Sequence, residues 1–250
     1  MDDVITVGVL TPHATAGADA EFALMAPGRV RTELSRIRTS AEMEPPTSPD
    51  GLRALAMPRV IDEAASTLPG SVDVFALAST STGYAIGHDA ESALVRRLGE
   101  RWNVPVRATS LSAVSALRSH RIERISLVHP PWFGPSLNRL GAEYFRGQGF
   151  DVVDAQLADV PDDPDRIEPA MVVEWVAQHL SHRAEAVVIG GNGFRASRAV
   201  QELEDRTGRL VLEANQVLLW SILDGTRPID VHGFGRLFGS RIKPHVRSTR

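Results

Sequence analysis

AVVIGGNGFRASRAVQELEDRTGRLVLEANQVLLW, from Ala186 to Trp220, indicates the kind of fold that the chain adopts. The apolar run AVVI meets Gly190 and Gly191, as a buried parallel strand does when it ends at a glycine turn. Ser197 is a candidate N-cap for the amphipathic helix that follows, and Gly208 is positioned to end that helix. The segment RLVLEANQVLLW repeats the order of strand and helix. This alternation predicts an α/β domain with a parallel sheet.

The same alternation runs through the rest of the chain and predicts two similar halves. We expect strands over 4–10, 30–37, 72–78 and 104–108 in the first half, and over 125–128, 152–155, 186–189 and 210–212 in the second. Periodicity leaves 30–37 open between strand and helix, and we favour a strand. Pro58 falls inside a helical pattern and predicts a break there. Residues 17–27 are weakly patterned, and the basic C-terminal tail is expected to be partly disordered.

Composition restricts the class of protein. The 250 residues are 43% hydrophobic and 23% charged, which is typical of a soluble globular protein. The net charge of −4 argues against a general nucleic-acid-binding protein. The longest apolar runs have the length of a strand, which argues against a membrane-spanning helix. The acidic start leads directly into a strand without the features of a signal peptide, so we expect a cytoplasmic protein. The chain has no cysteine, which excludes disulfides, thiolate metal sites and thiol nucleophiles.

Four segments carry a resemblance: GVLTPH (8–13), ALASTSTGY (76–84), GGNGFRA (190–196) and ANQVLLW (214–220). They resemble the aspartate/glutamate racemase superfamily, most closely its maleate cis-trans isomerase and arylmalonate decarboxylase branch. The resemblance implies two Rossmann-like lobes with parallel sheets, related by a pseudo-twofold axis, with a cleft between them. It implies one lobe of residues 1–113 plus 214–250 and another of residues 114–213. It also implies a small carboxylate ligand, no cofactor and no metal, with a homodimer as the expected assembly.

The two reactive positions of these relatives are changed here. The relatives use one or two thiols: the first strand-end loop often carries a reactive cysteine, at the position of Ser79, and the second carries the other, at the position of Gly191. This chain therefore cannot use a cysteine thiol as an acid, base or nucleophile. Ser79 is a candidate nucleophile, but a serine hydroxyl acts as one only beside a base.

The ends of the predicted strands supply candidate binding residues. The hydroxyls of Thr80, Ser81 and Tyr84 suit a carboxylate cradle, although small polar residues also make a tight turn and cap a helix. The Asn192 side-chain amide could hydrogen-bond to a substrate oxygen. Alternatively, Asn192 has a purely structural role in a turn with a left-handed backbone. The other candidates are Gly191, Arg195 and Asn215. Arg195 could bind a carboxylate with its guanidinium group or lie on the surface, and Asn215 could contact the ligand or be a helix N-cap.

His13 and His129 are candidate catalytic residues because each follows a first strand of its half and imidazole titrates near neutral pH. One ring could remove a proton across the cleft and the other return it. Each could instead cap a turn beside its neighbouring proline.

The leading hypothesis is a cofactor-independent isomerase or lyase that acts on a small carboxylic or dicarboxylic acid through an enolate-like intermediate, without cysteine. One alternative is a carboxylate-binding or regulatory module that kept the cleft and lost the chemistry. Another is an enzyme of a different class, for example a hydrolase, that uses His13 or His129.

Overall fold

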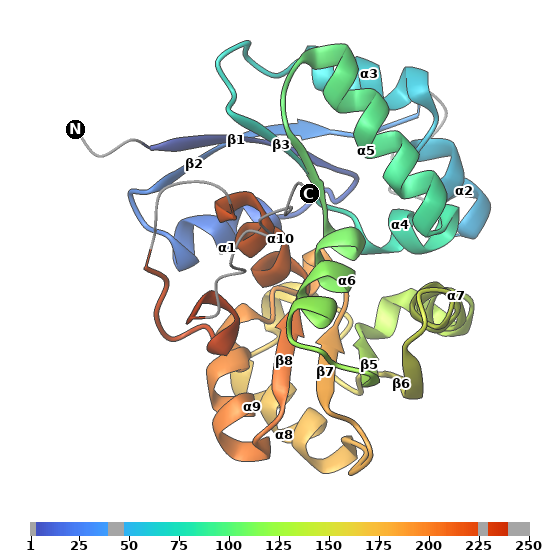
Figure 1. Ribbon diagram of the computed structural model, residues 1–250, viewed down its shortest axis with the longest axis vertical. Coiled ribbons are helices and arrows are strands. Elements are labelled where there is room, and N and C mark those ends of the chain that lie inside the picture. Colours follow the sequence, from blue (N-terminus) through green and yellow to red (C-terminus); the bar gives the residue numbers. More distant parts are fainter. Residues whose placement is uncertain (1–3, 40–47, 225–229, 240–250) are drawn as a thin grey trace, which may run out of the picture.

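The computed structural model describes residues 4–39, 48–224 and 230–239 and contains two four-stranded parallel sheets. The strand orders are β2-β1-β3-β4 and β6-β5-β7-β8, so the second half repeats the topology of the first. Figure 1 shows the two sheets in separate lobes, one above the other, with helices around each. The predicted α/β architecture with two similar halves is confirmed.

The first half of the chain forms one of the two sheets. Its elements are β1 (Ile5–Thr11), α1 (Ala18–Met25), β2 (Val30–Arg36), α2 (Pro49–Leu55), α3 (Pro58–Ser66), β3 (Val74–Leu77), α4 (Thr80–Ile86), α5 (His88–Trp102), β4 (Val106–Ala108) and α6 (Thr109–Ser119).

The second half ends with a helix that returns to the first. Its elements are β5 (Arg124–His129), η1 (Pro131–Phe133), α7 (Gly134–Arg146), β6 (Asp151–Leu157), η2 (Pro164–Arg166), α8 (Pro169–His179), β7 (Ala186–Ile189), η3 (Asn192–Phe194), η4 (Ser197–Ala199), α9 (Val200–Thr207), β8 (Leu210–Glu213), α10 (Ala214–Leu223) and η5 (Arg236–Gly239).

Apolar side chains on both faces of each sheet explain the layered arrangement. In the first sheet, one face packs on α1 and α10, and the opposite face packs on α2, α3 and α5. In the second sheet, one face packs on α8 and α9, and the other on α6 and α7. Strands that are buried on both faces read as continuous apolar runs, which is why β3, β7 and β8 could be recognised in the sequence.

Several local predictions need correction. The weakly patterned segment 17–27 contains helix α1, whose apolar residues do not form a clear stripe. The expected loop Ser79–Tyr84 is the start of helix α4, for which Ser79 is the N-cap. The strand at 30–37 and the helix break before Pro58 are confirmed. The basic end of the tail, residues 240–250, lies outside the described residues.

The helix caps also differ from expectation. Ser197 is not an N-cap but the first residue of η4, and α9 begins three residues later at Val200. The N-cap of α10 is Glu213, whose carboxylate accepts the Asn215 and Gln216 N–H groups in a capping box, so Asn215 lies inside the helix. A glutamate N-cap is not the residue type that the usual sequence signal looks for.

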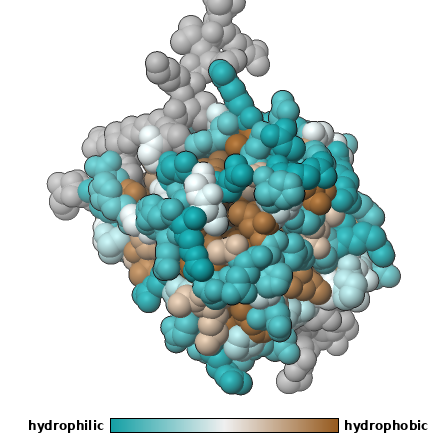
Figure 2. Space-filling model, turned by 90° about the horizontal axis from the view of Figure 1, so that it is seen from below, coloured by the Kyte–Doolittle hydropathy of each residue, from teal (hydrophilic) through white to brown (hydrophobic). Residues whose placement is uncertain are grey.

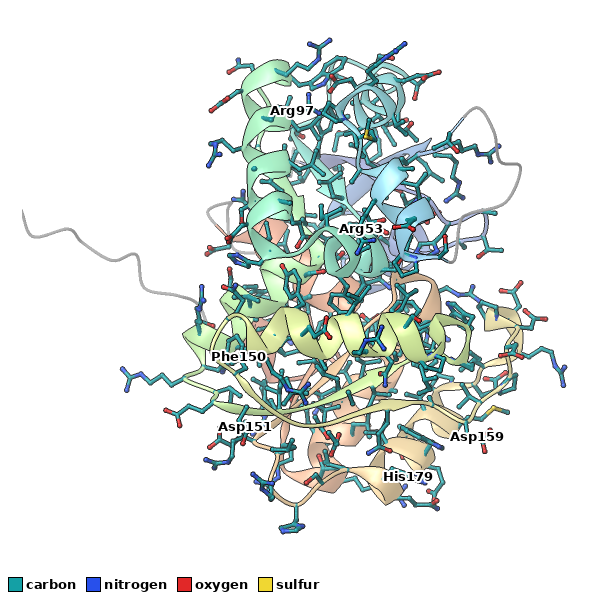
Figure 3. All side chains as sticks on the ribbon, turned by 90° about the vertical axis from the view of Figure 1, so that its right-hand side faces the viewer. Arg53, Arg97, Phe150, Asp151, Asp159 and His179 are labelled. Carbon is teal, nitrogen blue, oxygen red and sulfur yellow. The ribbon has the colours of Figure 1, made fainter. Side chains whose placement is uncertain are left out.

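Packing between the halves is extensive. A single hydrophobic cluster combines residues of both sheets with side chains of α4, α6, α7 and α10. Seen from the side, α7 crosses the middle of the molecule beneath α4 and α5, and the Arg53 side chain reaches toward α4, where it donates to the Ala85 carbonyl (Figure 3). The division of lobes at residue 113 falls inside α6, and that division stays a prediction.

The lower face of the molecule shows mostly hydrophilic side chains with hydrophobic ones scattered among them (Figure 2). Within the described ranges, no helix combines the length and the apolar character that a membrane span requires.

Candidate active site

The carboxyl ends of strands from both sheets meet between the two halves. Thr80 follows β3, Thr109 follows β4, Asn192 follows β7, and Glu213 ends β8. All four residues are buried, with exposed fractions of 3%, 2%, 0% and 0%. In open α/β sheets the ligand site lies beyond these strand ends. The polar side chains therefore gather where the topology places a ligand.

Asn192 is the centre of this polar cluster. Its Oδ1 accepts hydrogen bonds from the Thr80 backbone N–H at 3.0 Å and from the Thr80 hydroxyl at 3.1 Å. The Thr109 hydroxyl lies 3.2 Å from the same oxygen. The Thr80 Oγ1 in turn accepts the backbone N–H of Gly191 at 3.1 Å. One oxygen from the second sheet's loop is thus held by donors from the first.

Asn215 fixes the other end of the Asn192 amide. Asn192 Nδ2 donates to Asn215 Oδ1 at 2.9 Å, and Asn215 Nδ2 donates back to the Asn192 carbonyl at 3.0 Å. Asn215 Nδ2 also lies 3.2 Å from Glu213 Oε1. The predicted binding residues Thr80, Asn192 and Asn215 are therefore brought together, but their amides and hydroxyls are paired with one another.

A second buried carboxyl group stands near Glu213. Glu21 of α1 accepts the Ser197 backbone N–H at 3.1 Å, so it joins the two halves. Burial, together with the charge of Glu21, raises the pKa of Glu213 well above its usual value, and burial also raises the pKa of Glu21. Burial therefore favours the protonated form of both carboxyl groups.

Ser79 serves α4 rather than a nucleophilic pair. Its Oγ accepts the Thr82 backbone N–H at 3.3 Å and donates to the Thr82 hydroxyl at 2.7 Å. No base is among these partners, which a serine nucleophile requires. Ser81 is buried in the first turn of the same helix, at 6% exposure.

Gly191 has a backbone that a cysteine would resist. Its φ is +98°, and a Cβ built on it would lie 3.0 Å from both Cγ and Cδ of Pro130. A side chain at this position would therefore strain the backbone and press on the proline ring. Restoring the relatives' second cysteine here requires the loop to change shape.

His129 is fully buried behind Tyr84. Its Nδ1 lies 2.8 Å from Asn138 Oδ1, and its Nε2 lies 3.3 Å from the Tyr84 hydroxyl. Because Asn138 Nδ2 donates to the Ala155 carbonyl, its Oδ1 faces the ring, which assigns the proton to Nδ1 and leaves Nε2 to accept from Tyr84. Burial lowers the pKa of His129 to about 4, partly opposed by the Asn138 hydrogen bond. The imidazole is neutral at pH 7 and positions the tyrosine.

His13 lies beside the Asn192 loop and is half-buried. A Cβ on Gly193 would lie 3.5 Å from its Nδ1, and its Nε2 is buried without a hydrogen-bond partner among the described residues. Burial and then the neighbouring charge of Arg36 lower the pKa of His13 to about 4. A neutral imidazole with a free nitrogen can accept or deliver a proton, so His13 is better placed for chemistry than His129.

Arg195 points away from the cluster. Its guanidinium pairs with Asp165 of η2, and it lines a separate cavity of about 420 Å³ with Glu21 and Arg198. The sequence-based suggestion of a carboxylate fork in the central site is therefore not what this conformation shows.

The space at the cluster is small. A cavity lined by Thr80, Tyr84, Thr109 and Glu213, among others, has about 10 Å³ of free volume, which is the room of about one water molecule. Its lining includes neither histidine.

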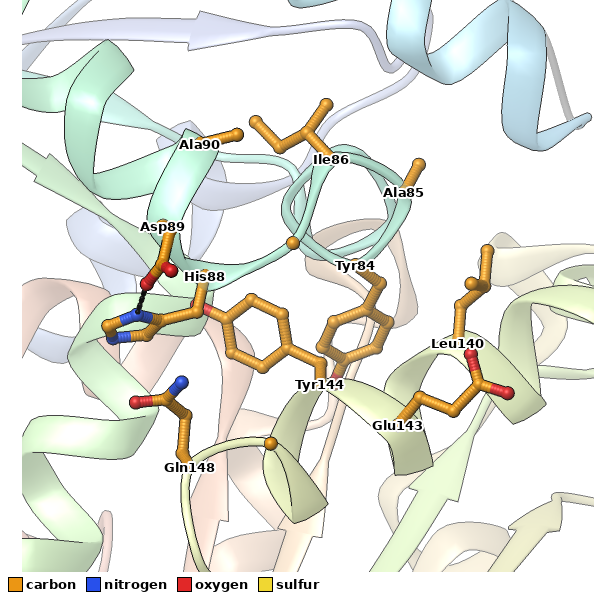
Figure 4. A pocket seen from close by; sticks show the side chains of 12 residues that line it. Tyr84, Ala85, Ile86, His88, Asp89, Ala90, Leu140, Glu143, Tyr144 and Gln148 are labelled. Atoms are coloured by element: carbon orange, nitrogen blue, oxygen red, sulfur yellow. Dashed lines mark hydrogen bonds and ion pairs between the residues drawn. The ribbon is translucent and has the colours of Figure 1, made fainter.

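A wider groove of about 590 Å³ lies between α4, the start of α5 and α7 (Figure 4). Tyr84 and Tyr144 form its floor, and His88 with Asp89 forms one side. Beneath it the Tyr144 hydroxyl donates to Glu91 Oε2 at 2.5 Å, which joins α7 to α5. Burial raises the pKa of Glu91 to about 7 and raises that of Tyr144.

Sequence reasoning missed three residues of this arrangement. Thr109 follows β4 at a carboxyl end, and the rule that ligands bind beyond these ends would have selected it. Glu213 ends β8 in the same way. Glu21 carries no signal, because only the packing of α1 against the second half brings it near Glu213.

Comparisons with known proteins agree with this architecture. The family model described as arylmalonate decarboxylase matches residues 46–238. The maleate isomerase Iso from Pseudomonas putida S16 superposes with a TM-score of 0.79 at 19% identity, covering 94% of this chain and 98% of that one. An arylmalonate decarboxylase structure gives 0.74 at 17% identity, with 94% and 99% covered.

A variant of the Nocardia farcinica maleate cis-trans isomerase, which holds a covalently bound succinylcysteine intermediate, gives a TM-score of 0.78 at 23% identity, with 94% and 98% covered. No curated protein matches the chain. The match of the family model over most of the sequence is decisive, and the chain belongs to the arylmalonate decarboxylase family.

Proposed function

We propose that the protein is a cofactor-independent isomerase or lyase that acts on a small carboxylic or dicarboxylic acid through an enolate-like intermediate, without cysteine. The observation that carries the proposal is the convergence of the Thr80 N–H and hydroxyl, with the Thr109 hydroxyl nearby, on one oxygen at 3.0–3.2 Å. Donors fixed at this range around one oxygen are what an oxyanion hole requires.

The chemistry follows from stabilising negative charge on a carboxylate oxygen. When an α-carbon loses a proton or a carboxyl group, its electron pair delocalises onto the remaining carboxylate as an enediolate, and the Thr80 donors would hold that oxygen. Because these donors are preorganised and buried, they lower the energy of the charged intermediate more than water does. His13, with its free Nε2, is the residue we assign to proton transfer.

A second candidate function is a carboxylate-binding or regulatory module without catalysis. Two observations favour it: Gly191 offers no acid at the second cysteine position, and the Ser79 hydroxyl is used by the α4 cap. The third alternative, an enzyme of another class that uses His13 or His129, has less support at His129, because that ring is used to hold Tyr84.

Small dicarboxylates should raise the melting temperature of the protein. At a concentration ten times its Kd, a ligand that binds only the folded state adds about 1.4 kcal/mol, which corresponds to about 3–5 °C for a chain of this size. Malonate, maleate, aspartate and glutamate are the probes, followed by differential scanning fluorimetry.

Thr80→Val should remove this shift, because it deletes the hydroxyl that faces the oxygen site. Thr67→Val is the matched control, since the Thr67 hydroxyl bonds to Ser35 and the Ala64 carbonyl, in the first sheet's α3 region. If all four acids leave the melting curve of the unmodified protein unchanged, the ligand class is wrong.

A further inference from the structure

The oxygen that fills the proposed oxyanion hole belongs to the protein itself. Asn192 Oδ1 accepts two hydrogen bonds from Thr80, and the Asn192 side chain has no exposed surface. A primary amide and a carboxylate have the same planar shape and present the same kind of acceptor oxygen. The Asn192 amide thus stands where one carboxylate oxygen of a ligand would stand.

The two cannot be present together. A ligand oxygen bound to both Thr80 donors would have to take the position that Asn192 Oδ1 already occupies, 3.0 Å from the Thr80 nitrogen and 3.1 Å from its hydroxyl oxygen. The Thr80 N–H has one proton to donate, and Asn192 Oδ1 already accepts it at 3.0 Å. A ligand carboxylate can reach these donors only after the Asn192 side chain leaves.

The local backbone is suited to such a movement. Asn192 is flanked by Gly191 and Gly193, and Gly191 has a φ of +98°, a value that favours glycine. What Asn192 loses on leaving is the pairing with Asn215, in which Asn192 Nδ2 donates at 2.9 Å and the Asn192 carbonyl accepts at 3.0 Å. Asn192 Nδ2 also donates to the Thr109 hydroxyl at 3.1 Å. These bonds, with those to Thr80, set the cost of opening.

We propose that Asn192 is an internal plug of the carboxylate site, which competes with the ligand for the Thr80 donors and must be displaced before a small carboxylate binds. The inference rests on the proposed function, because it takes the Thr80 donors as the ligand site. The plug also lowers the affinity of the unmodified protein. Its apparent affinity for a carboxylate is the affinity of the open form multiplied by the fraction of molecules in which Asn192 has left the Thr80 donors.

Asn192→Ala tests the plug directly. The variant removes the amide and leaves the Thr80 donors free, so formate and malonate should bind at least about tenfold more tightly than to the unmodified protein, as expected when a ligand no longer displaces two hydrogen bonds. Isothermal titration calorimetry measures both affinities, and thermal melts confirm that the variant is folded. Asn192→Ser, whose hydroxyl is too short to reach the plug position, serves if the alanine variant does not fold.

Asn138→Ala is the matched control. It also deletes a buried amide, but one whose partners are His129 and the Ala155 carbonyl. It should lower stability without tightening formate or malonate binding. Equal tightening in both variants would overturn the proposal, since the effect would then come from a loosened fold.

The outcomes separate the plug from the function. Suppose that the unmodified protein binds formate or malonate and that the Asn192 variants bind no more tightly. That result overturns the plug but supports the carboxylate site, with Asn192 as a ligand contact. Absence of binding by every form overturns both. A crystal structure of the unmodified protein with malonate gives an independent answer: the plug requires a malonate oxygen on the Thr80 N–H and Asn192 Oδ1 away from it, and Asn192 still on Thr80 contradicts it.

Discussion

His13→Gln should lower the turnover of any acid that the protein transforms by at least about a hundredfold, while ligand affinity stays within about threefold. A positioned general acid or base typically contributes a factor of about 10²–10⁴. His13 is the histidine with a free buried nitrogen beside the Asn192 loop, and glutamine keeps a polar group of similar length without the ability to exchange a proton near neutral pH. Steady-state kinetics separates the effect on kcat from that on KM.

The pH dependence of the same reaction follows from the low pKa of His13. Burial and the charge of Arg36 hold that pKa at about 4, so the imidazole is neutral from about pH 5 upward. If it accepts the substrate proton, turnover should be flat between about pH 5 and 8 and fall as the pH drops through about 4. His182→Gln is the control, because His182 is exposed in the second half. Turnover that survives in the His13 variant would rule out its role and direct attention to Tyr84.

Glu91→Gln should make the protein less sensitive to rising pH. The pKa of Glu91 is about 7 in the folded protein and about 4.5 when unfolded, so the folded state binds the proton more tightly. Its contribution is therefore fully present below about pH 4.5 and is lost as the pH rises through about 7. A difference of about 2.5 pKa units corresponds to on the order of 3 kcal/mol.

The physical basis is the contact between the halves. Glu91 of α5 accepts the Tyr144 hydroxyl of α7, and a charged carboxylate in that buried position costs free energy. The glutamine variant keeps an acceptor for Tyr144 and carries no charge.

Urea denaturation of both proteins at pH 5 and pH 8 measures the effect. The free energy of unfolding of the variant, minus that of the unmodified protein, should rise by roughly 2.5 kcal/mol between the two pH values. Contributions from His13 and His129, which act in the opposite direction below pH 6.5, cancel in this difference. Glu143→Gln on the exposed side of α7 is the control. A difference that does not change with pH would contradict the buried, protonated Glu91.

Much of the fold could be predicted because strands buried on both faces leave a strong pattern. The run Ala186–Ile189 before two glycines matches β7 at both ends. The helix α1 could not be found in this way, since its sequence ADAEFALM has no clear apolar stripe. The loop expected at Ser79–Tyr84 proved helical because the Ser79 side chain caps the segment, and hydroxyls at a strand end are compatible with both a turn and a cap.

The site could be predicted only in part. The rule that ligands bind beyond strand carboxyl ends selected Thr80 and Asn192, and the structure joins them. The contacts between these residues depend on how the two sheets pack against each other. The sequence therefore did not indicate that Asn192 Oδ1 would accept the hydrogen bonds of Thr80. Nor did it indicate that His129 would face Tyr84 and α7, because Asn138, its second partner, lies on a helix that periodicity places only approximately.

The central claim is that a member of this family without cysteine still stabilises an enolate-like intermediate. The most direct measurement is ¹H NMR of the purified protein in D₂O with arylmalonates, methylmalonate and maleate in turn, after iodoacetamide treatment to silence thiol enzymes that could contaminate the sample. The proposed function predicts that at least one acid is decarboxylated or isomerised, that a decarboxylation product carries deuterium at its α-carbon, and that Thr80→Val abolishes the reaction. Acids that bind in a Thr80-dependent manner yet remain chemically unchanged would contradict it and establish a binding module instead.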